Sequence, residues 1–227
     1  MIEVEWWDYD DADERVEAVA GDIRFLIESS LEARGDAVVA LSAEDRALAV
    51  LDRLKAEKLR WKHVTIVPTD DRLLSVEDPR SAARRLAERF LPLGARVVPL
   101  TGGDLAVAEA GRAADARLQA LHWPLDLVWL EVAADGHVAA ILPGADLDHA
   151  LTAPHRAVGL VPGDGGAARV TLTRASILAA RSLLLSLDGD QERAVLEQAL
   201  KEGAGSRHAV GRVLADSAQA IDVHWSA

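Results

Sequence analysis

The sequence predicts an α/β fold: an open, doubly wound, mostly parallel sheet with helices on both faces. Short apolar runs rich in β-branched residues alternate with longer amphipathic segments along most of the chain. This alternation is typical of parallel strands joined by crossover helices. The apolar runs also lack polar alternation, which indicates strands buried on both faces. With 227 residues the chain can bury a substantial core, and we predict a single domain over residues 1–227.

The first half of the chain contains four predicted strands. Residues 11–34 carry apolar side chains at helical spacing and are followed by Gly35, which indicates a helix and its end. The predicted strands are 37–42, 63–68, 96–100 and 125–133, and the helices between them are 44–60, 80–91 and 104–121.

The second half is less regular. Its predicted strands are 169–173, 182–187 and 220–225, and its predicted helices are 174–180 and 190–202. Because the pattern weakens after about residue 145, this region could form a smaller C-terminal lobe.

Composition and charge exclude several classes of protein. The chain has no cysteine, so a disulfide framework and thiolate metal sites are excluded. A net charge of −12 argues against binding to polyanionic nucleic acid. The acidic start does not resemble a signal peptide, and no apolar run approaches a membrane span. We therefore expect a cytoplasmic protein, a monomer or weak homodimer, that binds neither nucleic acid nor membrane.

Polar residues follow three of the predicted strands. The segments are SAEDR (42–46), TDDR (69–72) and ADGH (134–137). In open parallel sheets, ligands bind beyond the carboxyl ends of the strands. If these strands are neighbours, their loops form one cleft that holds an imidazole, several carboxylates and two guanidinium groups.

His137 is the candidate general base of this cleft, because a neutral imidazole accepts a proton near pH 7. Gly136 permits a positive φ just before it, and Asp135 either orients the loop or caps a helix. Arg72 is suited to an anionic substrate group or a developing oxyanion. The alternatives are a surface histidine at 137 and a solvated ion pair at 69–72. In SAEDR, Glu44 and Asp45 suit helix capping.

The sequence predicts neither a metal nor an organic cofactor. His149 and His155 are six residues apart across a proline, and no HExxH pattern occurs. The glycines of TGGDL (101–105) do not extend into a GxGxxG motif, so they give little support to dinucleotide binding.

Several motifs together resemble the 6-phosphogluconolactonase family, which is related to glucosamine-6-phosphate deaminase. LDLVWLEVAADGHVAAILPG (125–144) resembles the family's strand followed by its DGH loop. TDDR resembles the G-D-E-R segment, DPRSAAR (78–84) the D-P-x-S-N segment, and RVTLT (169–173) the R-I-T-L-T segment. GDQERAVLEQAL and RHAVGRVLADSAQAIDVHW follow in the family's order, so the resemblance covers nearly the whole chain.

This resemblance implies metal-independent hydrolysis of 6-phosphoglucono-1,5-lactone to 6-phosphogluconate in the pentose phosphate pathway. His137 would activate water, and Arg72 would bind the substrate or stabilise negative charge. Asp70 would hold Arg72 or His137 in place, and the loop residues Asp135 and Gly136 would contact the substrate.

The chain departs from the family at its phosphate-binding positions. The loop S-G-G-S-T-P is SAEDRA here, in which only Ser42 matches, and a family lysine aligns with Glu192. Two family glycines are Glu131 and Ala133. We predict that Arg46 and Arg193 replace the lost phosphate contacts.

Two other functions remain open at this point. One is a lactonase that acts on a non-phosphorylated sugar lactone. The other is a catalytically weak homologue that binds a sugar acid.

Overall fold

A seven-stranded parallel sheet forms the centre of the protein in a computed structural model that describes residues 2–102, 105–144, 146–161 and 166–227. Its strands are β1 (Val4–Tyr9), β2 (Ala37–Leu41), β3 (Val64–Pro68), β5 (Arg96–Val97), β6 (Leu127–Glu131), β9 (Leu183–Asp188) and β10 (Ile221–Ser226). They lie in the order β1-β10-β9-β6-β2-β3-β5, and neighbouring strands run parallel. A smaller antiparallel sheet has the order β4-β8-β7, built from Asp70–Arg72, Arg169–Leu172 and Ala157–Leu160 respectively.

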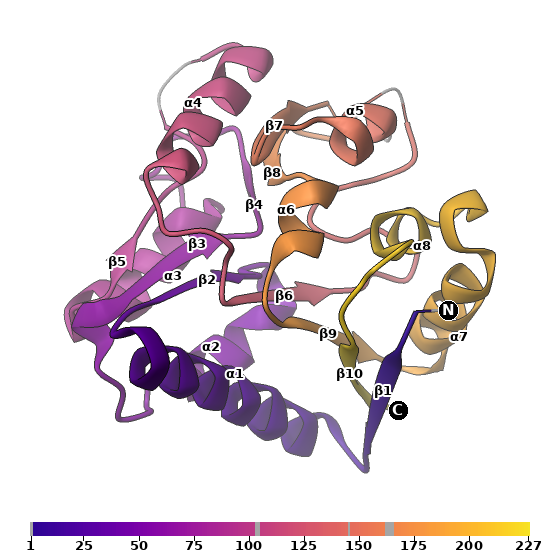
Figure 1. Cartoon of the computed structure of the whole chain (residues 1–227), viewed down its shortest axis with the longest axis horizontal. Coiled ribbons are helices and arrows are strands. Elements are labelled where there is room, and N and C mark those ends of the chain that lie inside the picture. The colour runs from indigo at the N-terminus through magenta and orange to yellow at the C-terminus, as the bar shows by residue number, and fades with distance from the viewer. Residues whose placement is uncertain (1, 103–104, 145, 162–165) are drawn as a thin grey trace.

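Helices cover both faces of the main sheet (Figure 1). One face packs against α1 (Ala12–Arg34), α2 (Leu48–Leu54) and α3 (Ala82–Phe90). The other face packs against α4 (Val107–Gln119), α5 (Leu147–Thr152), α6 (Arg174–Ala179), α7 (Asp190–Glu202) and α8 (Ala209–Leu214). The small sheet also lies on this second side, between α4 and α6 (Figure 1).

The central strands are apolar throughout because both of their faces are buried. In β2, Val38 and Ala40 belong to the core shared with α4 to α8, whereas Val39 and Leu41 belong to the core shared with α1 to α3. Successive strand side chains point to opposite faces, so a strand between two helical layers needs apolar residues at every position. This confirms the predicted doubly wound sheet.

Several helices and strands in the structure have other boundaries than those predicted from the sequence. The helix expected over 44–60 is a short 3₁₀ turn followed by α2, which ends where the apolar spacing stops at Leu54. The strand expected over 96–100 is the two-residue edge strand β5. The unpredicted elements are β1, β4, β7, α5 and α8.

The residues after 145 are not a lobe of their own. β9 and β10 extend the main sheet, whereas β7 and β8 pair with β4 from the first half of the chain. The small sheet therefore ties the two halves together.

The strand order places a switch point between β2 and β6. From β2 the chain builds outward through β3 to β5, and it then returns to β6 and builds through β9 and β10 on the other side. The loops after β2 and β6 consequently leave the sheet in opposite directions, which opens a crevice at the carboxyl ends of the strands.

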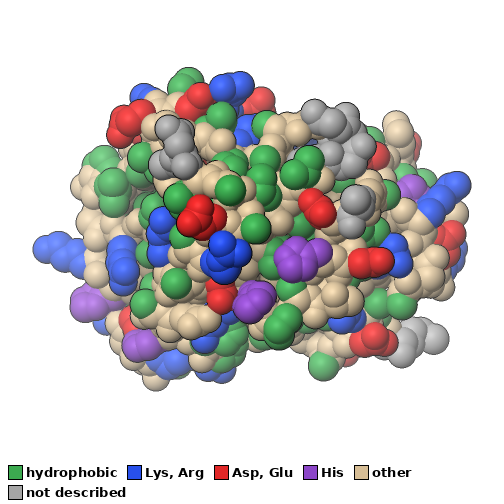
Figure 2. Space-filling model, turned by 90° about the horizontal axis from the view of Figure 1, so that it is seen from above, with side chains coloured by type: hydrophobic (Ala, Val, Ile, Leu, Met, Phe, Trp, Pro, Cys, Tyr) green, Lys and Arg blue, Asp and Glu red, His purple; other side chains and the backbone are tan. Residues whose placement is uncertain are grey.

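On the face seen in Figure 2, acidic, basic and histidine side chains lie interspersed among hydrophobic ones. Among the described residues, none of the helices combines the length and the apolar character needed to cross a lipid bilayer.

Candidate active site

A cleft of about 380 Å³ lies at the carboxyl ends of β2, β3 and β6. The three segments singled out in the sequence all contribute to its walls, and so does β8. The predicted site residues that line it are Ser42, Arg46, Asp70, Arg72 and His137. The crevice expected from the topology is therefore a real cavity of a size that suits a small metabolite.

The loop that carries His137 is held by α8. Gly136 has φ +81°, and a Cβ at this position would lie 2.7 Å from two atoms of His208. The backbone N–H of Val210 donates to the Gly136 carbonyl at 2.8 Å, and the ring Nδ1 of His208 lies 3.0 Å from the Asp135 carbonyl oxygen. Both the left-handed backbone and the close approach of His208 explain why glycine precedes the histidine.

Asp135 orients the imidazole of His137. Its Oδ1 lies 2.6 Å from Nδ1 of His137 and also accepts the backbone N–H of His137 at 3.0 Å. Burial acts to raise the pKa of Asp135, but the hydrogen bonds and charge of His137 outweigh it and lower that pKa. The ionised carboxylate accepts the Nδ1 proton, so the lone pair of the neutral ring is on Nε2.

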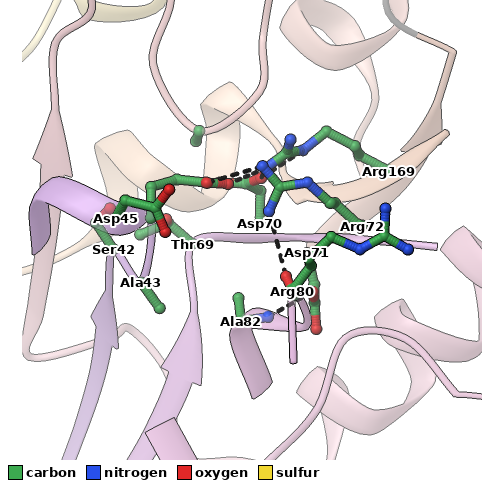
Figure 3. Close-up of polar contacts among 12 residues, drawn as sticks. Ser42, Ala43, Asp45, Thr69, Asp70, Asp71, Arg72, Arg80, Ala82 and Arg169 are labelled. Carbon is green, nitrogen blue, oxygen red and sulfur yellow. Dashed lines mark hydrogen bonds and ion pairs between the residues drawn. The ribbon is translucent and has the colours of Figure 1, made fainter. Parts of the chain in front are cut away.

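Two arginines face the cleft from neighbouring strands of the small sheet. Arg72 of β4 and Arg169 of β8 are directly opposite each other in the antiparallel register, and their guanidinium groups lie side by side (Figure 3). Nη2 of Arg72 donates to Glu44 Oε2 at 2.9 Å, and Nη2 of Arg169 donates to Glu44 Oε1. We call Arg72 and Arg169 the arginine pair.

Asp70 holds Arg169, one member of the arginine pair, in position. Its Oδ2 accepts from Nε of Arg169 at 2.8 Å and lies 2.7 Å from Nη2 of the same guanidinium. Its contact is thus with Arg169, and not with Arg72 or His137 as expected from the resemblance. The second acid of TDDR, Asp71, turns away and accepts from Ser81 Oγ and the N–H groups of Ala82 and Ala83 at the start of α3.

Glu44 is an ionised partner of the arginine pair. Burial acts to raise its pKa, but the charges and hydrogen bonds of Arg169 and Arg72 lower it overall. Its side chain makes no capping hydrogen bond with the turn that follows, which corrects the prediction that Glu44 caps a helix.

Two further carboxyl groups lie beside the loop after β2. Nη1 of Arg46 lies 2.5 Å from Glu192 Oε1, and Nη2 donates to the Val132 carbonyl at 3.0 Å. Ser42 Oγ donates to Glu131 Oε2 at 3.0 Å. Burial raises the pKa of Glu131 to about 7, although Arg46 and Ser42 oppose the shift. Glu131 is therefore a carboxyl group whose charge changes near neutral pH.

Arg193 lies away from the cleft. Its guanidinium carbon is 4.9 Å from the ring centre of Trp6 and 4.3 Å from that of Trp225, and Nη1 is 2.9 Å from Asp8 Oδ1. Neighbouring helix positions point about 100° apart, so Glu192 faces Arg46 while Arg193 faces the β1/β10 edge. We leave Arg193 out of the proposed site.

Arg169, Glu44 and Glu131 line the cleft but were not predicted from the sequence to be site residues. The arginine at the head of the apolar run RVTLT was a usable signal, because a charge there must lie at a strand end. In the described part of the chain, no three His, Asp or Glu side chains gather as metal ligands do.

Comparisons with known proteins agree with this architecture. A family model described as glucosamine-6-phosphate isomerases/6-phosphogluconolactonase matches residues 10–225. A 6-phosphogluconolactonase of Rhizobium meliloti (strain 1021) is 31% identical over 216 residues, which cover 92% of this chain and 93% of the relative. One from Mesorhizobium japonicum is 30% identical over 227 residues, which cover 97% and 94% of the two chains.

A crystal structure shows the same fold. A 6-phosphogluconolactonase from Shewanella baltica OS155 matches with a TM-score of 0.92 at 26% identity, covering 99% of this chain and 98% of the other. The match spans both the main sheet and the site-bearing segments described above. The chain therefore belongs to the glucosamine-6-phosphate isomerase/6-phosphogluconolactonase family.

Proposed function

We propose that this protein hydrolyses 6-phosphoglucono-1,5-lactone to 6-phosphogluconate, a step of the pentose phosphate pathway, in the cytoplasm. The observation that carries the proposal is that His137, which is paired with Asp135, lines the same cleft as the arginine pair. His137 can activate water, and the arginine pair can hold a phosphate group. The two relatives named above, 30% or more identical over almost their whole length, are 6-phosphogluconolactonases.

In the proposed reaction, Nε2 of His137 takes a proton from water while the water oxygen attacks the lactone carbonyl carbon. The tetrahedral intermediate then collapses, and the bond between that carbon and the ring oxygen breaks. The imidazolium returns its proton to the departing ring oxygen, which becomes a hydroxyl group. The carboxylate of Asp135 stabilises the imidazolium between these two transfers.

The arginine pair is the proposed phosphate contact. Two guanidinium groups that converge on one oxyanion match the geometry of a phosphate group. Asp70 keeps Arg169 in position through two contacts. Ser42 and Arg46 line the same cleft and complete the proposed substrate contacts.

Hydrolysis of a non-phosphorylated sugar lactone is the second candidate. The observation that favours it is the position of the Glu44 carboxylate, which pairs with both Arg72 and Arg169. Such a site would hydrolyse glucono-1,5-lactone at least as well as its 6-phosphate.

Replacing the proposed base tests the function. Freshly prepared 6-phosphogluconolactone is supplied, and lactone loss is measured above its spontaneous hydrolysis. We expect His137→Ala to lower kcat by at least about 100-fold, since general base catalysis contributes about 10²–10⁴-fold. The control is His122→Ala, because His122 is an exposed histidine that pairs with Asp36. A kcat for His137→Ala equal to that of the unmodified protein would contradict the proposal.

A further inference from the structure

The arginine pair is an arrangement that requires an anion. Arg72 and Arg169 occupy directly opposite positions of antiparallel strands, where like charges repel each other. Their side chains are only 26% and 15% exposed, so water screens this repulsion incompletely. A negative charge between them is therefore needed, and Asp70 contacts only Arg169.

Glu44 supplies that negative charge from within the chain. Its two carboxylate oxygens are divided between the two guanidinium groups, as two oxygens of a bound phosphate would be. The residue lies in the loop after β2, makes no capping bond, and leaves its side chain 37% exposed. Glu44 can consequently turn out of the arginine pair without breaking other side-chain hydrogen bonds that the structure shows.

Arg46, the other arginine lining the cleft, is already engaged. It pairs with the buried Glu192 and donates to the Val132 carbonyl. Moving it toward a substrate phosphate would leave the Glu192 carboxylate buried with a weaker set of partners, a costly outcome. The arginine pair is thus the better phosphate contact, but the Glu44 carboxylate already occupies it.

We propose that Glu44 is a specificity-determining residue that competes with the substrate phosphate for Arg72 and Arg169. A phosphorylated lactone must displace its carboxylate, whereas a non-phosphorylated lactone leaves it in place. Glu44 therefore sets the preference between the two substrates. The kinetic part of this inference rests on the proposed lactonase function.

The substitution Glu44→Gln removes the negative charge of this residue and keeps the shape of its side chain. In Glu44→Gln we expect KM for 6-phosphogluconolactone to fall about tenfold or more, because the competing charge is lost. The ratio of the KM for glucono-1,5-lactone to the KM for 6-phosphogluconolactone should therefore rise about tenfold or more, because only the phosphorylated lactone competes with Glu44. Glu57→Gln is the matched control, because Glu57 also pairs with an arginine and its side chain is 38% exposed, but it lies outside the cleft.

A binding measurement separates this inference from the proposed function. Inorganic phosphate is titrated into each purified variant by calorimetry, without any substrate. We expect phosphate to bind Glu44→Gln about tenfold or more tightly than it binds the unmodified protein or Glu57→Gln. If neither lactone is hydrolysed and phosphate binding still tightens, the lactonase proposal fails and the role of Glu44 stands.

The opposite results would overturn the inference. An unchanged or weaker phosphate affinity in Glu44→Gln, in a variant whose thermal unfolding midpoint shows that it folds, means that Glu44 does not compete. A KM that changes equally for both lactones means that Glu44 supports the cleft in general and does not select the phosphate.

Discussion

At the scale of single residues, the contact with Asp135 determines which nitrogen of His137 is available as the proposed base. We expect Asp135→Asn to lower kcat by about tenfold to hundredfold with little change in KM, because the neutral amide cannot stabilise the imidazolium. Steady-state kinetics with freshly prepared lactone measures both constants. If instead KM rises and kcat stays constant, Asp135 contacts the substrate and does not position the base.

At the residue scale, the sequence indicates the position of a residue in the fold where the signal is local. Asp135, Gly136 and His137 are consecutive, and their placement at a strand end could be read directly. The contact between Glu44 and Arg169 could not, because it joins residues 125 positions apart. It depends on the antiparallel pairing of β4 with β8, and the three-residue β4 has no periodic pattern to reveal it.

At the scale of elements, the contact between the His137 loop and α8 leaves no room for a side chain at Gly136. We expect Gly136→Ala to lower the free energy of unfolding by about 1–3 kcal/mol, since the new Cβ adds a clash with His208 to the strain of a positive φ. The displaced loop should also lower kcat. Urea denaturation and steady-state kinetics measure the two effects.

Gly35→Ala is the matched control for this prediction. Gly35 ends α1 with φ +85°, close to the value at Gly136, but a Cβ there would meet nothing within 4 Å. Gly35→Ala should therefore lower the free energy of unfolding by about 1 kcal/mol, from backbone strain alone, and leave kcat unchanged. Equal losses of stability at both glycines would show that the contact with His208 has no energetic role.

The elements that the sequence missed share a physical cause. β1 lies at the edge of the sheet, and its burial alternates without a continuous apolar run. β4 and α8 are short segments that depend on distant partners: β4 pairs with β8, and α8 packs against α5, α6 and α7. In contrast, β2 and β6 lie in the middle of the sheet, and burial on both sides gives them the apolar runs from which they were predicted.

At the scale of the whole molecule, the strand order places the cleft. Because β2 and β6 are adjacent while their successors diverge, the loops after them meet at one edge of the sheet. The sequence predicted this convergence only on the condition that the three strands are neighbours. It could not predict that Arg193, one position after Glu192, faces β1 and β10 and not the cleft, because that depends on the rotation of α7 about its axis.

Glu131 makes the stability of the whole protein depend on pH. Its pKa is raised from the ordinary value of 4.5 to about 7 in the folded protein. Between these two values the folded state retains a proton that the unfolded state has lost. The free energy of unfolding therefore falls as pH rises through this window, and the loss is complete above pH 7.

Glu131→Gln should remove this part of the pH dependence, because the amide keeps an oxygen for the Ser42 hydroxyl and cannot ionise. Relative to the unmodified protein, we expect the variant to gain about 2 kcal/mol of unfolding free energy between pH 5 and pH 8. Urea denaturation of both proteins at the two pH values measures the gain, and contributions from all other titrating groups cancel in the difference. Parallel stability curves would show that the Glu131 carboxyl titrates as it does in the unfolded chain, and that its burial beside Ser42 carries no electrostatic cost.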